Sequence, residues 1–203
     1  MPTPTTQPLA LHPAAQDLLF RQARTADRFT DEPVSDETVR AVHELVRLGP
    51  TAFNQQPLRL LLLRSAASRE RLAPHLSRGN REKTLRAPLT ALLAVDTRFH
   101  RRLPELFPAF PGAADLYTGN DALRERSALL NGALQAAYLL IGIRAAGLAA
   151  GPMSGFDEAG VNREFFPEGD LRALLVVNIG RPAGPPPRPR GPRLSYEETC
   201  TTL

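Results

Sequence analysis

Apolar residues recur at helical spacing in several stretches of the chain. Val39, Val42 and Val46 lie on one face of a helix that Ser35 or Asp36 can begin as the N-cap and that a Gly-Pro pair ends. The same spacing predicts helices over three shorter stretches: residues 14–24, 68–76 and 157–165. These helices alternate with stretches of a different pattern, which indicates a fold that contains both helices and strands.

The longest helical pattern runs from residue 120 to residue 146, which is about 40 Å at 1.5 Å per residue, and ends at Gly147. Its second half, GALQAAYLLIGIRAAG, is apolar on nearly all sides. Such a helix is buried at the centre of a fold or of an oligomer. A chain of this length offers few other elements to cover it, so the pattern favours an oligomer.

Three apolar runs predict strands that are covered on both faces. They are LRLLLLR (58–64), PLTALLAV (88–95) and ALLVVNIG (173–180). Between the second run and the long helix lies a proline-broken aromatic stretch over residues 96–119, which we expect to be a lid or a disordered loop. The whole pattern predicts one α+β or α/β domain over residues 16–203, preceded by a flexible extension over residues 1–15.

Composition limits the classes of function. No run of 18 apolar residues and no signal-peptide pattern occurs, so we expect a cytoplasmic protein that spans no membrane. A single cysteine, Cys200, rules out an intramolecular disulfide. The net charge is +4 and Lys83 is the only lysine, but the arginines are scattered, so we expect no nucleic-acid partner.

Motifs for common catalytic chemistry are missing. The four histidines lack metal-ligand spacing, and no serine-nucleophile elbow, phosphate-binding P-loop or GxGxxG fingerprint occurs. We therefore expect no metal, no catalytic side chain and no nicotinamide cofactor held on a Rossmann unit.

Four stretches could hold a ligand, and each also has a simpler interpretation. ARTADRF (23–29) places Arg24 beside a hydroxyl, as in a phosphate site or at a solvated helix end. GPTAFNQQP (49–57) offers amides that bond without titrating, or caps a strand. GPMSGFD (151–157) has two glycines that let backbone amides approach a flat ligand, or forms a plain turn. The arginines of the tail, at positions 188, 190 and 193, fit an anion site or a proline-rich linker.

The order of these stretches resembles the FMN-dependent nitroreductase family. RTxxxF comes near the start, GPTxxNxxP before a strand, GPMSGFD after a long helix, and NIG…PRLSYEE at the end. GNREKTLRAPLTALLAVD (79–96) and RLPELFP (102–108) are similar to the malonic semialdehyde reductase, or 3-hydroxypropanoate dehydrogenase, branch of pyrimidine catabolism. The resemblance covers residues 16–203 and implies a central mixed β-sheet flanked by helices in an intertwined homodimer, with FMN at the subunit interface.

The resemblance also implies roles for particular residues. Arg24 and Thr25 would hold the FMN phosphate and ribityl chain, helped by Arg190 and Arg193. The family commonly has a second basic residue where this chain has Asp27, which would leave the phosphate more dependent on the tail arginines.

The flavin ring would lie between two of the motifs. The residues expected to face it or grip its edges are Thr51, Asn54 and Gln56. The residues whose backbone amides would run beside flavin N5 are Met153, Ser154 and Gly155. Ser154 stands where the family often has an acidic residue, which leaves the preference for nicotinamide and substrate open.

The implied reaction passes a hydride from NAD(P)H to FMN and then to a small acceptor. Malonic semialdehyde would need a cation for its carboxylate, which Arg98, Arg101 or Arg102 could supply. A broad nitroaromatic or quinone reductase is the alternative, with Phe107 and Phe110 stacking on the substrate ring. Two other classes also remain, namely a non-catalytic flavin-binding protein and a basic scaffold that binds a partner through its tail.

Overall fold

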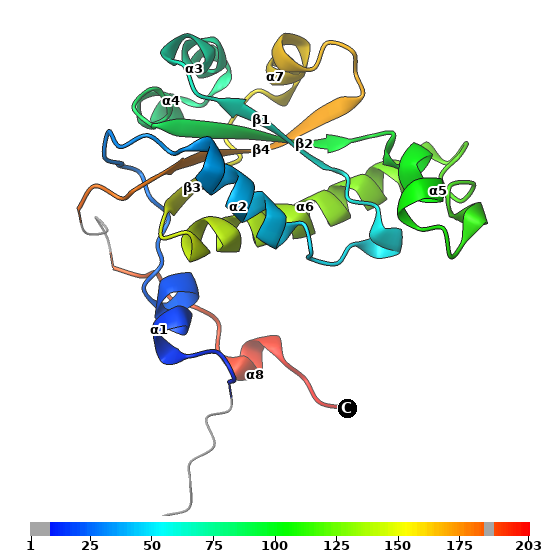
Figure 1. Cartoon of the computed structure of the whole chain (residues 1–203), viewed down its shortest axis with the longest axis horizontal. Coiled ribbons are helices and arrows are strands. Elements are labelled where there is room, and N and C mark those ends of the chain that lie inside the picture. Colours follow the sequence, from blue (N-terminus) through cyan, green and yellow to red (C-terminus); the bar gives the residue numbers. More distant parts are fainter. Residues whose placement is uncertain (1–8, 185–188) are drawn as a thin grey trace, which may run out of the picture.

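The computed structural model describes residues 9–184 and 189–203, which form a four-stranded sheet with helices on both faces (Figure 1). The strand order is β1-β2-β4-β3. The strands are β1 (Leu58–Leu63), β2 (Leu89–Asp96), β3 (Ala149–Met153) and β4 (Leu171–Gly180). All three pairings are antiparallel, so the sheet in this part of the chain is antiparallel, whereas a mixed sheet was expected. The α+β class is confirmed.

The three strands expected from apolar runs are present, and β3 is an additional strand. Its sequence, AAGPM, contains glycine and proline and no β-branched residue, so it lacks the composition of a strand. Proline is tolerated there because β3 lies at the edge of the sheet and pairs only with β4.

Strand β2 is covered on both faces, as its apolar run predicted, because it is buried along nearly its whole length between two helical layers. Leu89, Ala91 and Leu93 pack with α2 (Asp36–Val46) and α6 (Asp121–Ala145), while Leu92 packs on the opposite face. The helices of that opposite face are α3 (Ala66–Leu72), α4 (Arg78–Leu85) and α7 (Glu158–Phe165) (Figure 1).

Strand β1 is less covered than expected, because it lies at the other edge of the sheet. Leu61 keeps 37% of its surface exposed, and only Leu63 of this strand is fully buried. The expectation that this run is covered on both sides is wrong for the single chain.

Helix α6 follows the predicted span closely and is the core helix of the fold. It packs on α2 and on all four strands, although by length and composition alone it would qualify as a membrane span. One side of it, however, is uncovered: Leu129, Leu130 and Leu134 are exposed. Helix α2 also begins as predicted, with the Ser35 hydroxyl oxygen accepting a hydrogen bond from the Thr38 N–H (3.2 Å).

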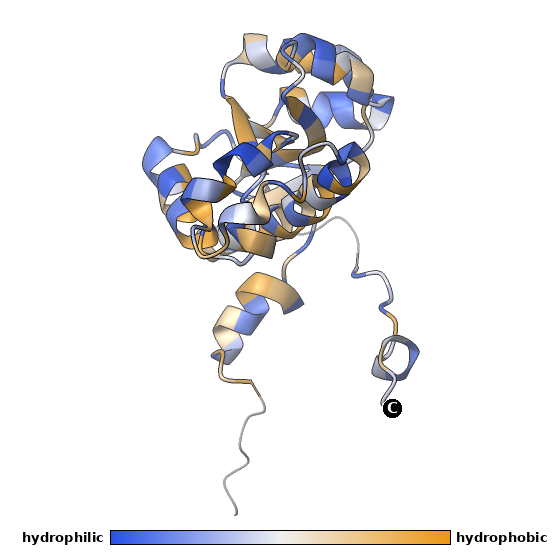
Figure 2. Ribbon diagram, turned by 90° about the vertical axis from the view of Figure 1, so that its right-hand side faces the viewer, coloured by the Kyte–Doolittle hydropathy of each residue, from blue (hydrophilic) through white to orange (hydrophobic). Residues whose placement is uncertain are grey.

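The N-terminal helix is shorter than predicted. Helix α1 (Pro13–Gln16) continues into a π-helical turn over Asp17–Arg21, so Arg24 lies beyond the helix. Leu18 is exposed, because this helix stands away from the body (Figures 1 and 2). Residues 1–8 lie outside the described residues, and the boundary of the N-terminal extension stays a prediction.

Residues 96–119 do not form a structureless loop. Three short helical segments occupy this stretch: Phe99–Arg102, α5 (Leu103–Leu106) and Pro111–Ala113. Phe99, Leu103 and Tyr117 are buried in a small apolar cluster of their own, which orders the stretch. The tail ends with α8 (Tyr196–Thr199), where Ser195 and Glu198 form a capping box.

Candidate functional site

The segment that contains Arg24 and Arg28 is held by backbone hydrogen bonds on both sides. The Ala26 N–H donates to the Ala150 carbonyl in β3 (3.0 Å), and the Ala183 N–H donates to the Arg28 carbonyl (3.1 Å). Two motifs that are more than a hundred residues apart, ARTADRF and GPMSGFD, are therefore neighbours in the fold.

Gly151 makes this contact possible. A Cβ atom at position 151 would lie against the Ala26 carbonyl oxygen, well inside van der Waals contact. The sequence suggested that the glycines of GPMSGFD let a ligand approach the backbone. For Gly151 the structure gives another reason, because it is the chain's own segment 24–28 that approaches there.

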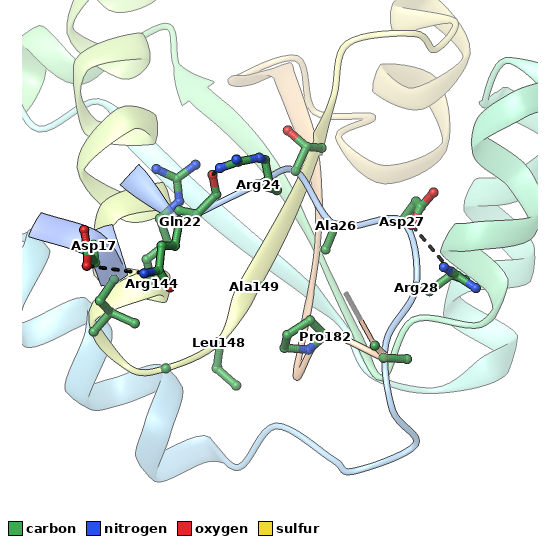
Figure 3. Close-up of a pocket in the computed structure, with 16 residues that line it drawn as sticks. Asp17, Gln22, Arg24, Ala26, Asp27, Arg28, Arg144, Leu148, Ala149 and Pro182 are labelled. Carbon is green, nitrogen blue, oxygen red and sulfur yellow. Dashed lines mark hydrogen bonds and ion pairs between the residues drawn. The ribbon is translucent and has the colours of Figure 1, made fainter. Parts of the chain in front are cut away.

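A cavity of about 280 Å³ opens beside this segment (Figure 3). Its charged lining consists of Arg24, Arg28, Arg144, Asp17 and Asp27. The Arg24 Nη1 donates to the Arg21 and Ala23 carbonyls (both 3.0 Å), while its buried Nε has no hydrogen-bond partner in the part of the chain that the structure describes. A buried guanidinium donor without an acceptor suits an anionic ligand.

The tail arginines face main-chain carbonyls rather than the cavity. The Arg190 Nη2 donates to three carbonyls at the end of the π-helical turn, those of Phe20, Arg21 and Ala23 (2.7–2.9 Å). Arg193 bonds to the carbonyls of its own tail at Gly191 and Pro192. Arg188 lies outside the described residues.

Arg190 nevertheless lies in a positively charged environment. Desolvation lowers the pKa of Arg190, and the positive charges of three neighbours lower it further: Arg24, Arg193 and Arg144. The cations expected near a phosphate are thus close together, and Arg144 is one that the sequence did not single out.

The residues after β3 offer free backbone donors. Met153 is buried, whereas Ser154 and Gly155 are exposed, and in the described part of the chain neither of these two N–H groups has an acceptor. The Gly155 carbonyl is fixed by the Ser77 N–H and by Asn80 Nδ2, both at 3.0 Å. These contacts hold the turn against α4.

A second cavity, of about 520 Å³, lies between the Arg28 segment and α4. Lys83 lines it together with Arg28, Asp27 and Glu82. Sequence reasoning did not assign Lys83 or Asn80, although an isolated lysine in an arginine-rich chain was a signal for the first of them.

The loop at residues 51–56 has an unusual backbone. Phe53, Asn54 and Gln56 have positive φ values of 48°, 51° and 45°, a region that non-glycine residues seldom occupy. Such strain persists only where the surroundings fix it, and it clusters at functional sites.

Two buried amides fix this loop. Asn131 of α6 accepts a hydrogen bond from the Ala52 N–H at its Oδ1 (2.8 Å). Gln55 is 1% exposed and bonds to the Tyr117 hydroxyl (2.7 Å), to Ser127 and to Asn131. Neither amide was predicted from the sequence as a site residue, although Asn131 is a polar residue beside the apolar half of the long helix.

The amides that the sequence did select bond mainly to their own loop and its neighbour. Gln56 Nε2 donates to Asn54 Oδ1 (2.8 Å), Asn54 Nδ2 donates to the Leu106 carbonyl (3.0 Å), and Thr51 Oγ1 accepts from the Gln56 N–H (3.3 Å). Asn54 is exposed and Gln56 half-buried, so both can be reached from outside the chain.

Aromatic rings join this loop to the segment at residues 99–113. Phe53 packs edge-on against Phe107 with ring centroids 5.5 Å apart, and Phe110 lies 6.1 Å from Phe53. Of the arginines expected to act as substrate cations, Arg98 pairs with Asp170 and Arg102 with Glu105. Arg101 has no ion pair in the part of the chain that the structure describes.

One chain does not bring all the predicted residues together. The Arg24 cavity lies beside Arg144 at the end of α6, whereas the 51–56 loop is bound to Asn131, thirteen residues earlier. At 1.5 Å per residue the two groups are about 20 Å apart along α6. Figure 1 shows the segment around residue 25 and the 3₁₀ turn at Ala52–Asn54 toward different ends of this helix.

The chain matches the nitroreductase family over residues 21–181. A candidate NADH dehydrogenase/NAD(P)H nitroreductase from Streptomyces griseus is 59% identical over 195 residues, which are 96% of this chain and 99% of that protein. A similarly named Streptomyces coelicolor protein is 58% identical, with the same coverage of both chains.

Solved structures have the same fold. A candidate Bacillus subtilis nitroreductase superposes with a TM-score of 0.86 at 22% identity, covering 95% of this chain and 100% of its own. A candidate nitroreductase from Exiguobacterium sibiricum, solved in complex with FMN, has a TM-score of 0.80 at 16% identity, covering 93% and 96%. By sequence match and by fold, the chain belongs to the nitroreductase family.

Proposed function

We propose that the protein is an FMN-dependent oxidoreductase that uses NAD(P)H. The observation that carries this proposal is the hydrogen bond from the Ala26 N–H to the Ala150 carbonyl, which joins the segment that lines the arginine-rich cavity to β3, the strand that leads to the free N–H groups of Ser154 and Gly155. The phosphate of FMN would use the arginines of the cavity, and its flat ring would use the free N–H groups. The FMN complex of a structural neighbour and the names of the Streptomyces relatives support the proposal.

The residues present fit FMN. Arg24 has a buried donor without a partner for a phosphate oxygen, and Thr25 adds a hydroxyl on the cavity wall. The N–H groups of Ser154 and Gly155 can donate to the ring, while Arg28 and Lys83 can meet its polar edge from the second cavity. FMN, when bound, accepts a hydride and passes it on, so the protein needs only to bind, orient and shield it.

A second copy of the chain would complete the site. The 51–56 loop is bound to α6 about 20 Å from Arg144, so we expect it to serve the flavin of a second copy and not the flavin of its own chain. The exposed apolar residues of α6 and of the N-terminal helix, together with a tail that stands away from the body, are what an intertwined homodimer would cover (Figure 2). In this arrangement Asn54 and Gln56 of one copy would face the flavin held by the other.

The visible spectrum of the purified protein tests the proposal. We expect a flavin band that bleaches when NAD(P)H is added without oxygen. A band that NAD(P)H does not bleach would favour a non-catalytic flavin-binding protein. A colourless protein that also fails to take up added FMN would contradict the proposal.

For the acceptor, we propose a small aldehyde acid, malonic semialdehyde, on the resemblance of residues 79–96 and 102–108. Because Arg98 and Arg102 are paired with acids, Arg101 is the cation of this segment that remains for a carboxylate. We expect Arg101→Gln to raise the KM for malonic semialdehyde about fivefold or more and to leave the KM for a nitroaromatic unchanged. A KM for the acid equal to that of the wild type would contradict this assignment.

A second acceptor class, nitroaromatics or quinones, is favoured by the aromatic rings beside Asn54. Phe53, Phe107 and Phe110 form a surface on which a planar substrate could stack. If this class is the natural one, Phe107→Leu should lower kcat/KM for a nitroaromatic about three- to tenfold, with little effect on the semialdehyde. The ratio of the two wild-type kcat/KM values then decides between the acceptors.

A further inference from the structure

The positive charge of the Arg24 cavity is not supplied in the way that the family resemblance implies. Asp27 occupies the position of a common basic residue and lines the cavity itself. The tail arginines were expected to supply the missing positive charge, but they donate hydrogen bonds to main-chain carbonyls. Arg190 donates at the end of the π-helical turn, and Arg193 donates within its own tail. The cavity nevertheless has another cation, Arg144, which comes from the last turn of α6.

Arg144 is half-buried and weakly engaged. Its Nη1 donates to the Leu19 carbonyl (2.8 Å), and within residues 9–184 and 189–203 it has no other hydrogen bond and no ion pair. A guanidinium has five N–H donors, so most of them remain available. Burial lowers the pKa of Arg144, because desolvation disfavours its charged form and no acid compensates for it among the described residues.

The acids of the cavity do not neutralise Arg24 and Arg144. Asp17 bonds to Gln22 (3.3 Å) and pairs with Arg21 (3.6 Å), and Asp27 lies 3.9 Å from Arg28. Arg24 and Arg144 thus share one cavity, approached by segments from both ends of the chain, and lack a counter-charge among the described residues (Figure 3). A phosphate monoester, with nearly two negative charges, would provide it.

We propose that Arg144 binds the FMN phosphate and supplies the cation that is missing at position 27. This inference rests on the proposed function and assigns a binding residue to its site. Because Arg144 would contact the phosphate and not the ring, it should distinguish FMN from riboflavin, which has the same ring and ribityl chain without the phosphate.

The test titrates FMN and riboflavin into flavin-free protein, full length, and follows the quenching of flavin fluorescence. The variants are Arg144→Gln and, as a matched control at an exposed arginine of α7, Arg163→Gln. We expect Arg144→Gln to weaken FMN binding about tenfold or more and riboflavin binding less than about twofold, and Arg144→Lys to restore part of the FMN affinity. Arg163→Gln should change neither.

The outcomes separate this inference from the proposed function. An unchanged ratio of FMN to riboflavin affinity in Arg144→Gln, whether both affinities stay or both fall, overturns the phosphate contact and leaves the proposed function standing. A wild-type protein that binds neither flavin overturns both. A selective loss of FMN affinity supports the assignment, and the riboflavin titration of the same sample shows that the variant is folded.

Discussion

Replacing Arg24 with glutamine should weaken FMN binding by about a hundredfold or more. The Arg21 and Ala23 carbonyls orient its guanidinium, and its buried Nε has no partner among residues 9–184 and 189–203. Two hydrogen bonds to a charged phosphate at about 1.5–3 kcal/mol each correspond to at least that loss. Titration of flavin-free protein with FMN measures it.

The control for Arg24 is Arg163→Gln on α7, an exposed arginine remote from the cavity, which should bind FMN like the wild type. Riboflavin affinity should fall much less than FMN affinity in Arg24→Gln, because the lost contacts are to the phosphate. If Arg24→Gln bound FMN with the wild-type dissociation constant, the phosphate would have to lie elsewhere, and the cavity would lose its assigned role.

Periodicity predicted the elements whose burial comes from the chain's own layers. Strand β2 alternates its side chains between two helical layers and therefore reads as a continuous apolar run. Strand β3 has no such signal, because AAGPM forms an edge strand whose hydrogen bonds come from β4 and whose Gly151 accommodates residue 26. Residues 96–119 looked irregular because prolines break them, yet Phe99 and Tyr117 give them a small core of their own.

The sequence predicted the separate motifs of the candidate site, but it did not predict how the fold arranges them. Arg24 stood out because it lies beside a hydroxyl in a motif, while Arg144 is one of many arginines until α6 places it on the cavity wall. Gln55 lies between two amides that were selected, and its importance comes from burial against Tyr117 and Asn131, which local sequence does not encode. Contacts between distant segments decide these roles.

Replacing Asn131 with leucine should lower the free energy of unfolding by about 2–4 kcal/mol. Asn131 is 2% exposed, and its loss leaves the Ala52 N–H without its acceptor and the buried Gln55 Oε1 with only the Ser127 hydroxyl as donor. Each unsatisfied buried group costs about 1–3 kcal/mol. The melting temperature should fall roughly 5–15 °C, measured at one fixed protein concentration because dimerisation would also shift it.

The control is Arg163→Leu, at an exposed position of α7, which should change the free energy of unfolding by less than about 0.5 kcal/mol. Three residues of the 51–56 loop have positive φ, and such conformations cost about 1–3 kcal/mol each, so a loop released from Asn131 should relax. Asn54 and Gln56 would then leave their positions, and turnover with NAD(P)H should fall even at temperatures where Asn131→Leu is folded. A folded variant with wild-type turnover would show that the strained loop does not act at the flavin. Its positive-φ backbone would then have only a structural role, in packing against residues 99–113.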